Sequence, residues 1–278
     1  MGTCLEQQTD NLKGVDCMFC GFNVKLTEQD IMAPCFVQSG RELFEQQKAT
    51  ACGAIHDYIL DDNLLSKEKI EAEWFPDFKA NVFLSHSHKD EELVIAFAGW
   101  LHELFGITSF IDSCVWGYSE ELLKNIDDAF CVSRKDSAGN ITYDYQKRNQ
   151  STAHVHMILN TALMKMIDST ECLMFVNTPN SILLDNVIDG TATASPWIYS
   201  ELLTSRLIRH RKLSEYRQKI ISEHTARYDS LGVRYDVEMD HLVDMQQCDL
   251  LYLWTKYRNK GPETALDGLY KWRGILNA

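Results

Sequence analysis

The stretch from Asn81 to Asp112 constrains the fold of this chain more than any other. It reads NVFLSHSHKDEELVIAFAGWLHELFGITSFID. The apolar run that ends at His86 predicts a β-strand, and apolar residues then recur at helical spacing from Leu93 to Leu104. Gly106 stands where a glycine commonly ends a helix, and the closing ITSFID predicts a second strand. A strand, a helix and a strand in this order are typical of a parallel sheet.

Later segments extend the same pattern. Residues 171–177, ECLMFVN, form the most apolar strand candidate, and unbroken apolarity is what a central strand covered on both faces requires. Helices are predicted over residues 120–131 and 152–167. The polar stretch between them, at about 133–150, predicts a surface excursion or a hairpin. We therefore predict a doubly wound, flavodoxin-like α/β fold.

The ends of the chain have a different texture. Residues 1–78 mix short apolar patches with acidic turns and predict an N-terminal extension that is mostly helical. Residues 79–278 are predicted to form the α/β domain, with the insertion at about 133–150 and an extended, mostly helical C-terminal part. In that part VRYDVEM, residues 233–239, suggests a later strand, and a last helix is expected near residues 266–275.

Charge and hydropathy exclude several classes of function. The formal net charge of −13 argues against a nucleic-acid partner, because phosphate contacts need a basic surface. The densest basic stretch, residues 206–212, is better explained as the end of a helix, where cations favour the helix dipole. The longest apolar runs are too short to span a bilayer, so we expect no membrane contact and a cytoplasmic protein.

The nine cysteines do not form a recognisable framework. Their number is odd and they are scattered, so a secreted disulfide scaffold does not fit. Cys17 and Cys20 have a metal-ligand spacing, but the chain offers no second pair of that kind. His86 and His88 form an H-x-H pair in a loop, which by itself is a weak signal of a metal site. We therefore predict no metal site, although the role of the two cysteines stays open.

The segment SPWIYSELLTSRL, residues 195–207, predicts a helix with a well-defined start. Ser195 is a suitable N-cap and Pro196 fits the first helical position. Trp197 and Glu201 are four residues apart and share one face of this helix. A single glutamate on a helix is ordinarily a solvated surface residue. Its position after the predicted strands suggests another role.

Three loops leave the carboxyl ends of the predicted strands. They comprise residues 85–90, 112–119 and 178–195. In an open parallel sheet, ligands bind in the crevice at these ends. The helix that carries Glu201 begins where the third loop ends. The glutamate is therefore expected at the mouth of a nucleotide-type crevice.

Four segments in this order resemble the Toll/interleukin-1 receptor (TIR) domain. They are NVFLSHSHKDEEL, TSFIDSCVWGYSEEL, MIDSTECLMFVNTPNS and SPWIYSEL, and the resemblance covers about residues 79–210. Within that family the chain is most similar to bacterial stand-alone TIR proteins of anti-phage defence, such as those of Thoeris systems. Two features depart from the family pattern: the insertion at about 133–150, and the absence of the cysteine often found after the tryptophan of SPWIYSEL.

The resemblance implies that the chain is an NAD+ nucleosidase with Glu201 as its catalytic residue. In enzymatic TIR domains the nicotinamide–ribose bond of NAD+ is cleaved, and the ADP-ribose is hydrolysed or cyclised into a signalling nucleotide. One carboxylate can suffice, because nicotinamide leaves as a neutral molecule and needs no acid to protonate it. NAD+ is then the substrate and no cofactor is expected. Self-association and a downstream effector that senses the product are the implied partners.

The same match implies a substrate pocket. Two of its residues end the first strand, one ends the second strand, and two lie in the loop that closes over substrate or contacts the next protomer. Independently of the match, the tryptophan one turn before the glutamate is expected to exclude water beside it. In that order the predicted substrate-binding residues are Ser85, His86, Asp112, Trp116, Gly117 and Trp197.

Two alternatives remain at this stage. A non-catalytic TIR adaptor would act by protein contacts through residues 114–119, without dependence on Glu201. A nucleoside deoxyribosyltransferase-like enzyme would share the fold type and a catalytic glutamate. Hydrolysis and cyclisation are not distinguished either, because the outcome depends on which group captures the ribosyl cation.

Overall fold

The centre of the computed structural model is a five-stranded parallel sheet, which confirms the predicted doubly wound α/β fold. The structure describes residues 20–26, 31–49, 79–137, 139–183, 192–208, 211, 213–217, 235–236 and 239–276. In spatial order the strands are β3 (Ser109–Ile111), β2 (Val82–Ser85), β6 (Cys172–Val176), β1 (Cys20–Val24) and β9 (Val243–Met245).

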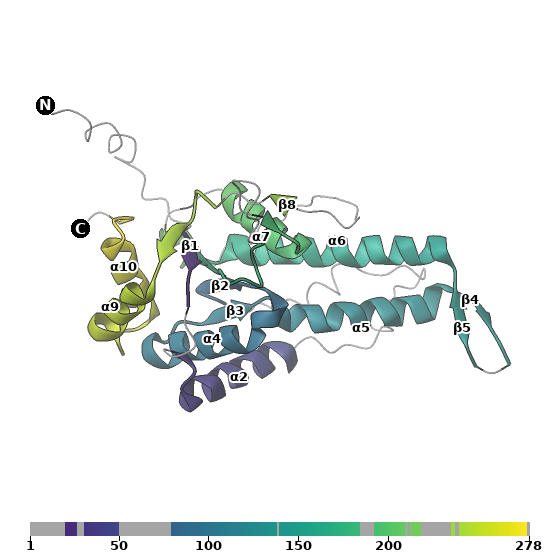
Figure 1. Cartoon of the computed structure of the whole chain (residues 1–278), viewed down its shortest axis with the longest axis horizontal. Helices are drawn as coiled ribbons and strands as arrows, with labels where there is room; N and C mark the ends of the chain where they lie inside the picture. Colours follow the sequence, from purple (N-terminus) through teal and green to yellow (C-terminus); the bar gives the residue numbers. More distant parts are fainter. Residues whose placement is uncertain are drawn as a thin grey trace, which may run out of the picture.

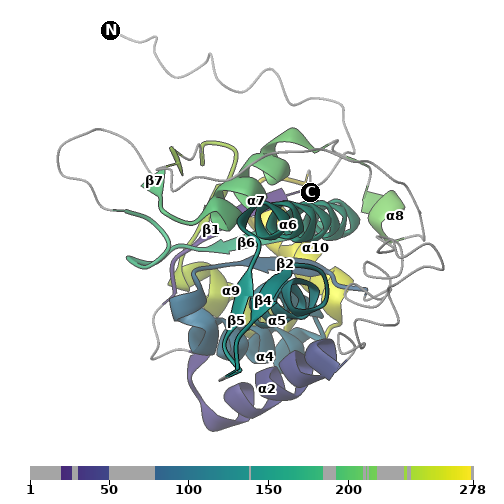
Figure 2. The same ribbon diagram turned by 90° about the vertical axis from the view of Figure 1, so that its right-hand side faces the viewer.

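Helices cover both faces of this sheet. In Figures 1 and 2, α6 and α7 lie on one side, and α4 lies on the other side with α2 outside it. The helices are α2 (Pro34–Ala49), α4 (Glu91–Phe105), α5 (Ser113–Phe130), α6 (Tyr145–Ser169), α7 (Pro196–Leu207), α8 (Leu213–Tyr216), α9 (Gln247–Tyr257) and α10 (Pro262–Trp272). The smaller elements are η2 (His88–Asp90), β4 (Val132–Lys135), β5 (Ile141–Tyr143), β7 (Ala192–Thr193) and β8 (Tyr235–Asp236).

The strand–helix–strand unit predicted for residues 81–112 is present as β2, α4 and β3. Helix α4 ends at Gly106, whose φ of 68° places it in the left-handed region, where glycine is favoured. Its N–H donates to the carbonyl oxygen of His102, which closes the helix. The apolar face of α4 lies in the core against the sheet. The local signals in this stretch were therefore sufficient to predict its structure.

The described part of residues 1–78 belongs to the sheet rather than to an extension. Strand β1 pairs in parallel with both β6 and β9, and α2 packs on α4. The two helices touch through glycines: a Cβ atom on Gly99 would lie 1.9 Å from the carbonyl oxygen of Phe36. The boundary predicted at residue 79 is thus corrected for residues 20–49. Strand β1 contains a glycine and an asparagine, both depleted in strands, and so gave a weak signal.

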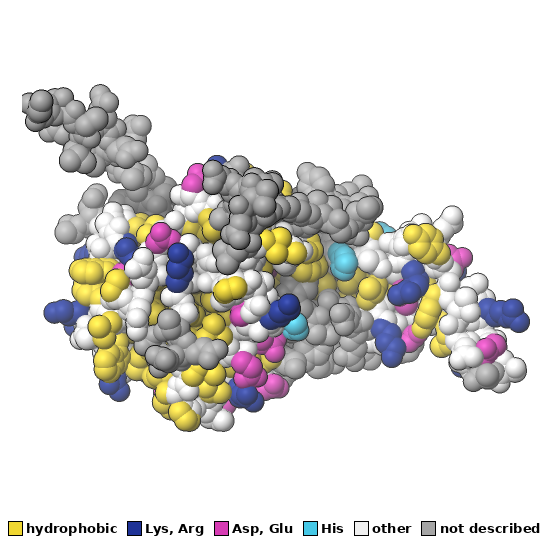
Figure 3. All heavy atoms as spheres, viewed as in Figure 1, with side chains coloured by type: hydrophobic (Ala, Val, Ile, Leu, Met, Phe, Trp, Pro, Cys, Tyr) yellow, Lys and Arg dark blue, Asp and Glu magenta, His cyan; other side chains and the backbone are white. Residues whose placement is uncertain are grey.

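The loop predicted over residues 112–119 is also corrected, because α5 begins at Ser113. The first part of the polar insertion is confirmed as a hairpin, but its last residues, 145–150, belong to α6, which begins earlier than predicted. Strands β4 and β5 pair in antiparallel fashion, and the hairpin lies at the far end of the arm formed by α5 and α6 in Figure 1. On the face drawn in Figure 3, Lys and Arg side chains are dispersed among carboxylates and apolar side chains. Among the helices that the structure describes, none is long and apolar enough to cross a bilayer.

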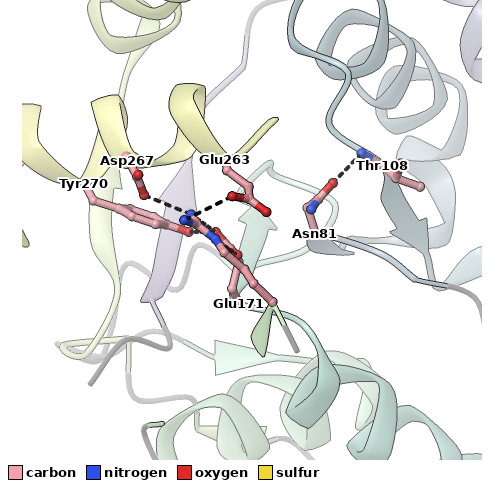
Figure 4. A network of polar contacts seen from close by, with 7 residues as sticks. Asn81, Thr108, Glu171, Glu263, Asp267 and Tyr270 are labelled. Carbon is pink, nitrogen blue, oxygen red and sulfur yellow. Dashed lines mark hydrogen bonds and ion pairs between the residues drawn. The ribbon is translucent and has the colours of Figure 1, made fainter. Parts of the chain in front are cut away.

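A partly buried ion-pair network ties the amino end of β6 to helix α10. Glu171, directly before β6, accepts hydrogen bonds from Arg217 (3.1 Å) and from the hydroxyl of Tyr270 (3.2 Å). Arg217 also bonds to Asp267 at 2.9 Å and lies 3.6 Å from Glu263. Figure 4 shows Glu263, Asp267 and Tyr270 of α10 converging on Glu171 at the end of the strand. Because this end of a parallel sheet lies opposite the carboxyl ends, the network stabilises the fold and does not belong to the predicted site.

Candidate functional site

Helix α7 places Glu201 inside the protein rather than on its surface. The start of the helix is as predicted: the side chain of Ser195 accepts a hydrogen bond from the backbone N–H of Ile198, and Pro196 is the first helical residue. Glu201 follows one turn later and is 1% exposed. A carboxyl group removed from water in this way needs partners, and these come from the sheet.

The closest partner is Ser85, the last residue of β2. Its hydroxyl donates to Oε2 of Glu201 at 2.6 Å, and the serine is fully buried. The second carboxyl oxygen of Glu201, Oε1, is buried. It has no hydrogen-bond partner among the described residues while the group is ionised, whereas a proton on Glu201 lets it bond to Asp112. Buried polar atoms are nearly always paired in folded proteins. The unpaired oxygen of the Glu201 carboxylate, beside the carboxyl end of β2, therefore marks a candidate ligand-binding site.

Two further predicted residues complete the cluster. Asp112 follows β3, contacts Glu201 and is 2% exposed. Nδ1 of His86 lies 2.6 Å from Oδ1 of Asp112, and both side chains are buried. The structure therefore brings together four of the predicted residues, which we call the carboxyl-end cluster: Ser85, His86, Asp112 and Glu201.

Burial and like charge govern the ionisation of Glu201. Burial raises its pKa well above the ordinary value, the charge of Asp112 raises it further, and the hydrogen bond from Ser85 opposes the shift. The pKa of His86 responds to opposing effects. Burial lowers it, but the charge and hydrogen bond of Asp112 outweigh burial and raise it overall. The arrangement favours a protonated Glu201 beside a histidine–aspartate ion pair.

The remaining predicted residues have other surroundings. Trp197 is half-buried, and its ring meets the ring of His156 on α6 edge to face at 5.6 Å between centroids. Trp116 and Gly117 lie in the first turns of α5, and the side chain of Trp116 is outside the described part of the structure. The structure thus brings His156 to Trp197, a contact that sequence reasoning missed because the two residues come from different helices.

Sequence reasoning also missed a polar bridge between β2 and β6. Asp90, the last residue of η2, accepts hydrogen bonds from the hydroxyl of Thr178 (2.5 Å) and from Nδ2 of Asn180 (2.7 Å). Ser87 and Asp90 have the spacing of a capping box, but the Ser87 side chain makes no capping bond. The connections from β2 and β6 leave in opposite directions, so this bridge spans the switch point of the sheet, where ligands of such folds bind.

The described residues contain no group of three or more His, Cys, Asp or Glu side chains that could hold a metal ion. His86 is buried whereas His88 is exposed, so the two do not face a common point. Cys20 lies in β1, where burial raises the pKa of its thiol to about 12. Cys17 lies outside the described residues.

Comparisons of the chain with known protein families, with curated proteins and with solved structures give no match.

Replacing Glu201 with glutamine is expected to stabilise the fold at pH 8. A carboxyl group whose pKa is higher in the native state than in the unfolded state binds more protons when folded, so its contribution to stability falls as pH rises. The glutamine amide can accept from Ser85 and donate to Asp112. We expect the free energy of unfolding to rise by about 1 kcal/mol or more at pH 8.

Urea denaturation at pH 8 and at pH 5 measures this effect. The gain should shrink at pH 5, where the native Glu201 is protonated. Glu103→Gln, at an exposed position on α4, is the matched control and should change little at either pH. A Glu201→Gln variant that is less stable than the wild type at pH 8 would contradict the assignment of a raised pKa.

Proposed function

We propose that the protein cleaves the nicotinamide–ribose bond of NAD+, with Glu201 as the catalytic carboxylate. The observation that carries the proposal is the buried Oε1 of Glu201, which in the ionised carboxylate has no hydrogen-bond partner among the described residues while Ser85 holds Oε2. The cluster stands at the carboxyl ends of β2 and β3, where nucleotides bind in folds of this kind. The resemblance of four sequence segments to TIR domains supports NAD+ as the substrate.

The chemistry requires a fixed negative charge in a dry site. As nicotinamide departs, the ribose acquires positive charge, and a carboxylate beside it stabilises that charge most strongly where water is excluded. Burial disfavours the ionised form of Glu201 in the free protein. The cationic nicotinamide ring of bound NAD+ would lower the pKa of Glu201, so that the carboxylate forms when substrate is present.

Each of the other residues in the cluster has a role in this proposal. Ser85 orients the carboxyl group by its hydrogen bond. His86 holds Asp112 as an ion pair, and the charge of Asp112 adds to the negative potential at the ribose. Water captures the ribosyl cation in hydrolysis, and another group of the same ADP-ribose captures it in cyclisation.

The burial of Glu201 has a consequence for regulation. With 1% of its surface exposed, the side chain meets substrate only after its neighbours move. We include in the proposal that self-association or a trigger opens the site. A cytoplasmic role in antiviral defence, with a signalling nucleotide read by a downstream effector, follows from the resemblance to Thoeris-type TIR proteins and forms part of the same proposal.

Incubation with NAD+, followed by mass spectrometry of the products, tests the proposal. We expect free nicotinamide together with ADP-ribose or a cyclic isomer, and a specific activity that rises with protein concentration. A parallel incubation with 2′-deoxynucleosides distinguishes the deoxyribosyltransferase alternative. Release of base from the deoxynucleosides, with NAD+ left intact at every protein concentration, would overturn the proposed substrate.

A further inference from the structure

A second polar cluster lies on the same edge of the sheet as the carboxyl-end cluster. Ser85 is in register with Phe175, Phe175 with Asn23, and Asn23 with Asp244. These four residues form one row across β2, β6, β1 and β9. Register partners in a parallel sheet project from the same face, so Asn23 and Asp244 face the side from which Ser85 reaches Glu201.

Hydrogen bonds order this second cluster. Nδ2 of Asn177 donates to Oδ1 of Asn23 at 2.9 Å, and Nδ2 of Asn23 donates to Oδ1 of Asp244 at 2.9 Å. Asn23 is 8% exposed and fixed between its neighbours, whereas the side chain of Asp244 is exposed. The chain of amides therefore holds one carboxylate in a defined orientation at the rim.

The spacing between the clusters suits a ligand with two sugar units. Neighbouring strands are separated by about 4.8 Å, so Asn23 lies about 10 Å and Asp244 about 14 Å from Ser85 along the row. A mononucleotide bound at Glu201 would end before it reached Asp244. A ribose joined through a diphosphate to a second ribose is long enough to pass the carboxyl end of β6, beyond the buried Phe175, and to reach the second cluster.

We propose that Asp244, oriented by Asn23 and Asn177, binds the 2′,3′-diol of the distal ribose of a dinucleotide substrate. The inference rests on the proposed function and adds to it that the adenosine half is recognised. A carboxylate accepts hydrogen bonds from both hydroxyls of a ribose, a common mode of recognition at the rim of such sheets. Asp244 thereby selects a dinucleotide over nicotinamide mononucleotide, which has the same scissile bond and no second ribose.

The neighbouring backbone argues for hydroxyl groups rather than a phosphate at this position. Helix α9 begins directly after β9, and the N-terminus of a helix is an anion site when its N–H groups are open. Here the carboxylate of Asp249 already accepts a hydrogen bond from the backbone N–H of Gln246 at 2.7 Å, and its negative charge stands at the start of the helix. The carboxylate of Asp244 would repel a phosphate. The groups that fit are hydrogen-bond donors without negative charge, as in a ribose diol.

The test compares two substrates in the wild type and in Asp244→Asn. Asparagine keeps an oxygen that can accept from Asn23, so the fold is retained while the carboxylate is lost. We expect the KM for NAD+ to rise about tenfold or more, and kcat/KM for nicotinamide mononucleotide to stay within about twofold. An equal change for both substrates, or no change for either, would overturn the inference.

A binding measurement separates this inference from the proposed function. Isothermal titration with ADP-ribose should show about tenfold weaker affinity for Asp244→Asn than for the wild type, whether or not the protein turns over NAD+. Asp240→Asn removes an exposed carboxylate that pairs with Arg206 and should leave the affinity unchanged. If the wild type does not cleave NAD+ but binds ADP-ribose about tenfold more tightly than Asp244→Asn does, the proposed reaction is refuted and the subsite is retained. Equal ADP-ribose affinity in all three proteins refutes the subsite.

Discussion

Glu201→Gln is expected to reduce the rate of nicotinamide release from NAD+ by at least about 10²- to 10³-fold. Removal of one group that stabilises developing charge in a dry site has effects of this size, and the glutamine amide carries no negative charge. Its shape and its contact with Ser85 are preserved, because Oε1 of a glutamine can accept the bond that Oε2 of Glu201 accepts at 2.6 Å. The loss should therefore appear in kcat, with the fold intact.

Glu103→Gln is the control for this experiment. It makes the same chemical change at an exposed position of α4, away from the carboxyl ends of the strands, and should retain full activity. Ser85→Ala should fall between the two variants, because the carboxylate remains but loses the hydrogen bond that orients it. Wild-type rates in Glu201→Gln would remove this residue from the mechanism and favour a non-catalytic role for the protein.

The stability and activity of Glu201→Gln should change in opposite directions. The glutamine amide relieves the contact of Glu201 with Asp112, whereas the proposed reaction needs the carboxylate, so the substitution trades activity for stability. Loss of activity combined with a gain in stability at pH 8 would therefore be stronger support than either result alone.

The parts of the fold that were predictable have local signals. The strand before His86, the glycine that ends α4 and the serine that begins α7 are each specified within a few residues of sequence. The polar composition of the insertion likewise predicted the hairpin formed by β4 and β5. Strands β1 and β9 were harder to predict, because β1 contains a glycine and an asparagine and because the place of both strands in the sheet depends on pairing between segments far apart in the chain. Asn23 and Asp244, which bond directly, are 221 residues apart.

The candidate site was predictable as a set of positions but not as an electrostatic arrangement. Ser85, His86 and Asp112 follow predicted strands, so their convergence at one edge was expected. The burial of Glu201 was not visible from its helix, where a glutamate ordinarily faces solvent. The structure of residues 112–119 was misjudged because glycine and serine there suggested a loop, whereas α5 continues through them. Its start at Ser113 leaves the Asp112 side chain in contact with His86 and Glu201.

Arg217→Met is expected to lower the free energy of unfolding by about 3–5 kcal/mol. The arginine neutralises Glu171, whose side chain is only 3% exposed, and its loss would leave that carboxylate with the hydroxyl of Tyr270 as its remaining partner in the network. Methionine preserves much of the apolar length of the arginine side chain, so most of the loss comes from the unpaired charge. Urea denaturation at pH 8 gives the value.

The matched control is Arg206→Met, which removes an arginine from the exposed ion pair with Asp240 and should cost about 0–1 kcal/mol. A second substitution, Glu171→Leu, made in the Arg217→Met background, should recover much of the stability because it removes the buried charge that the first left unpaired.

The pH dependence of the stability loss in Arg217→Met follows from the charge of Glu171. Burial already raises the pKa of Glu171 against the opposing effect of Arg217, and without the arginine the pKa rises further. Protonation then relieves the penalty, so Arg217→Met should be less destabilising at pH 5 than at pH 8. Equal losses at both pH values, with no recovery in the double variant, would mean that Arg217 acts through packing rather than through its charge.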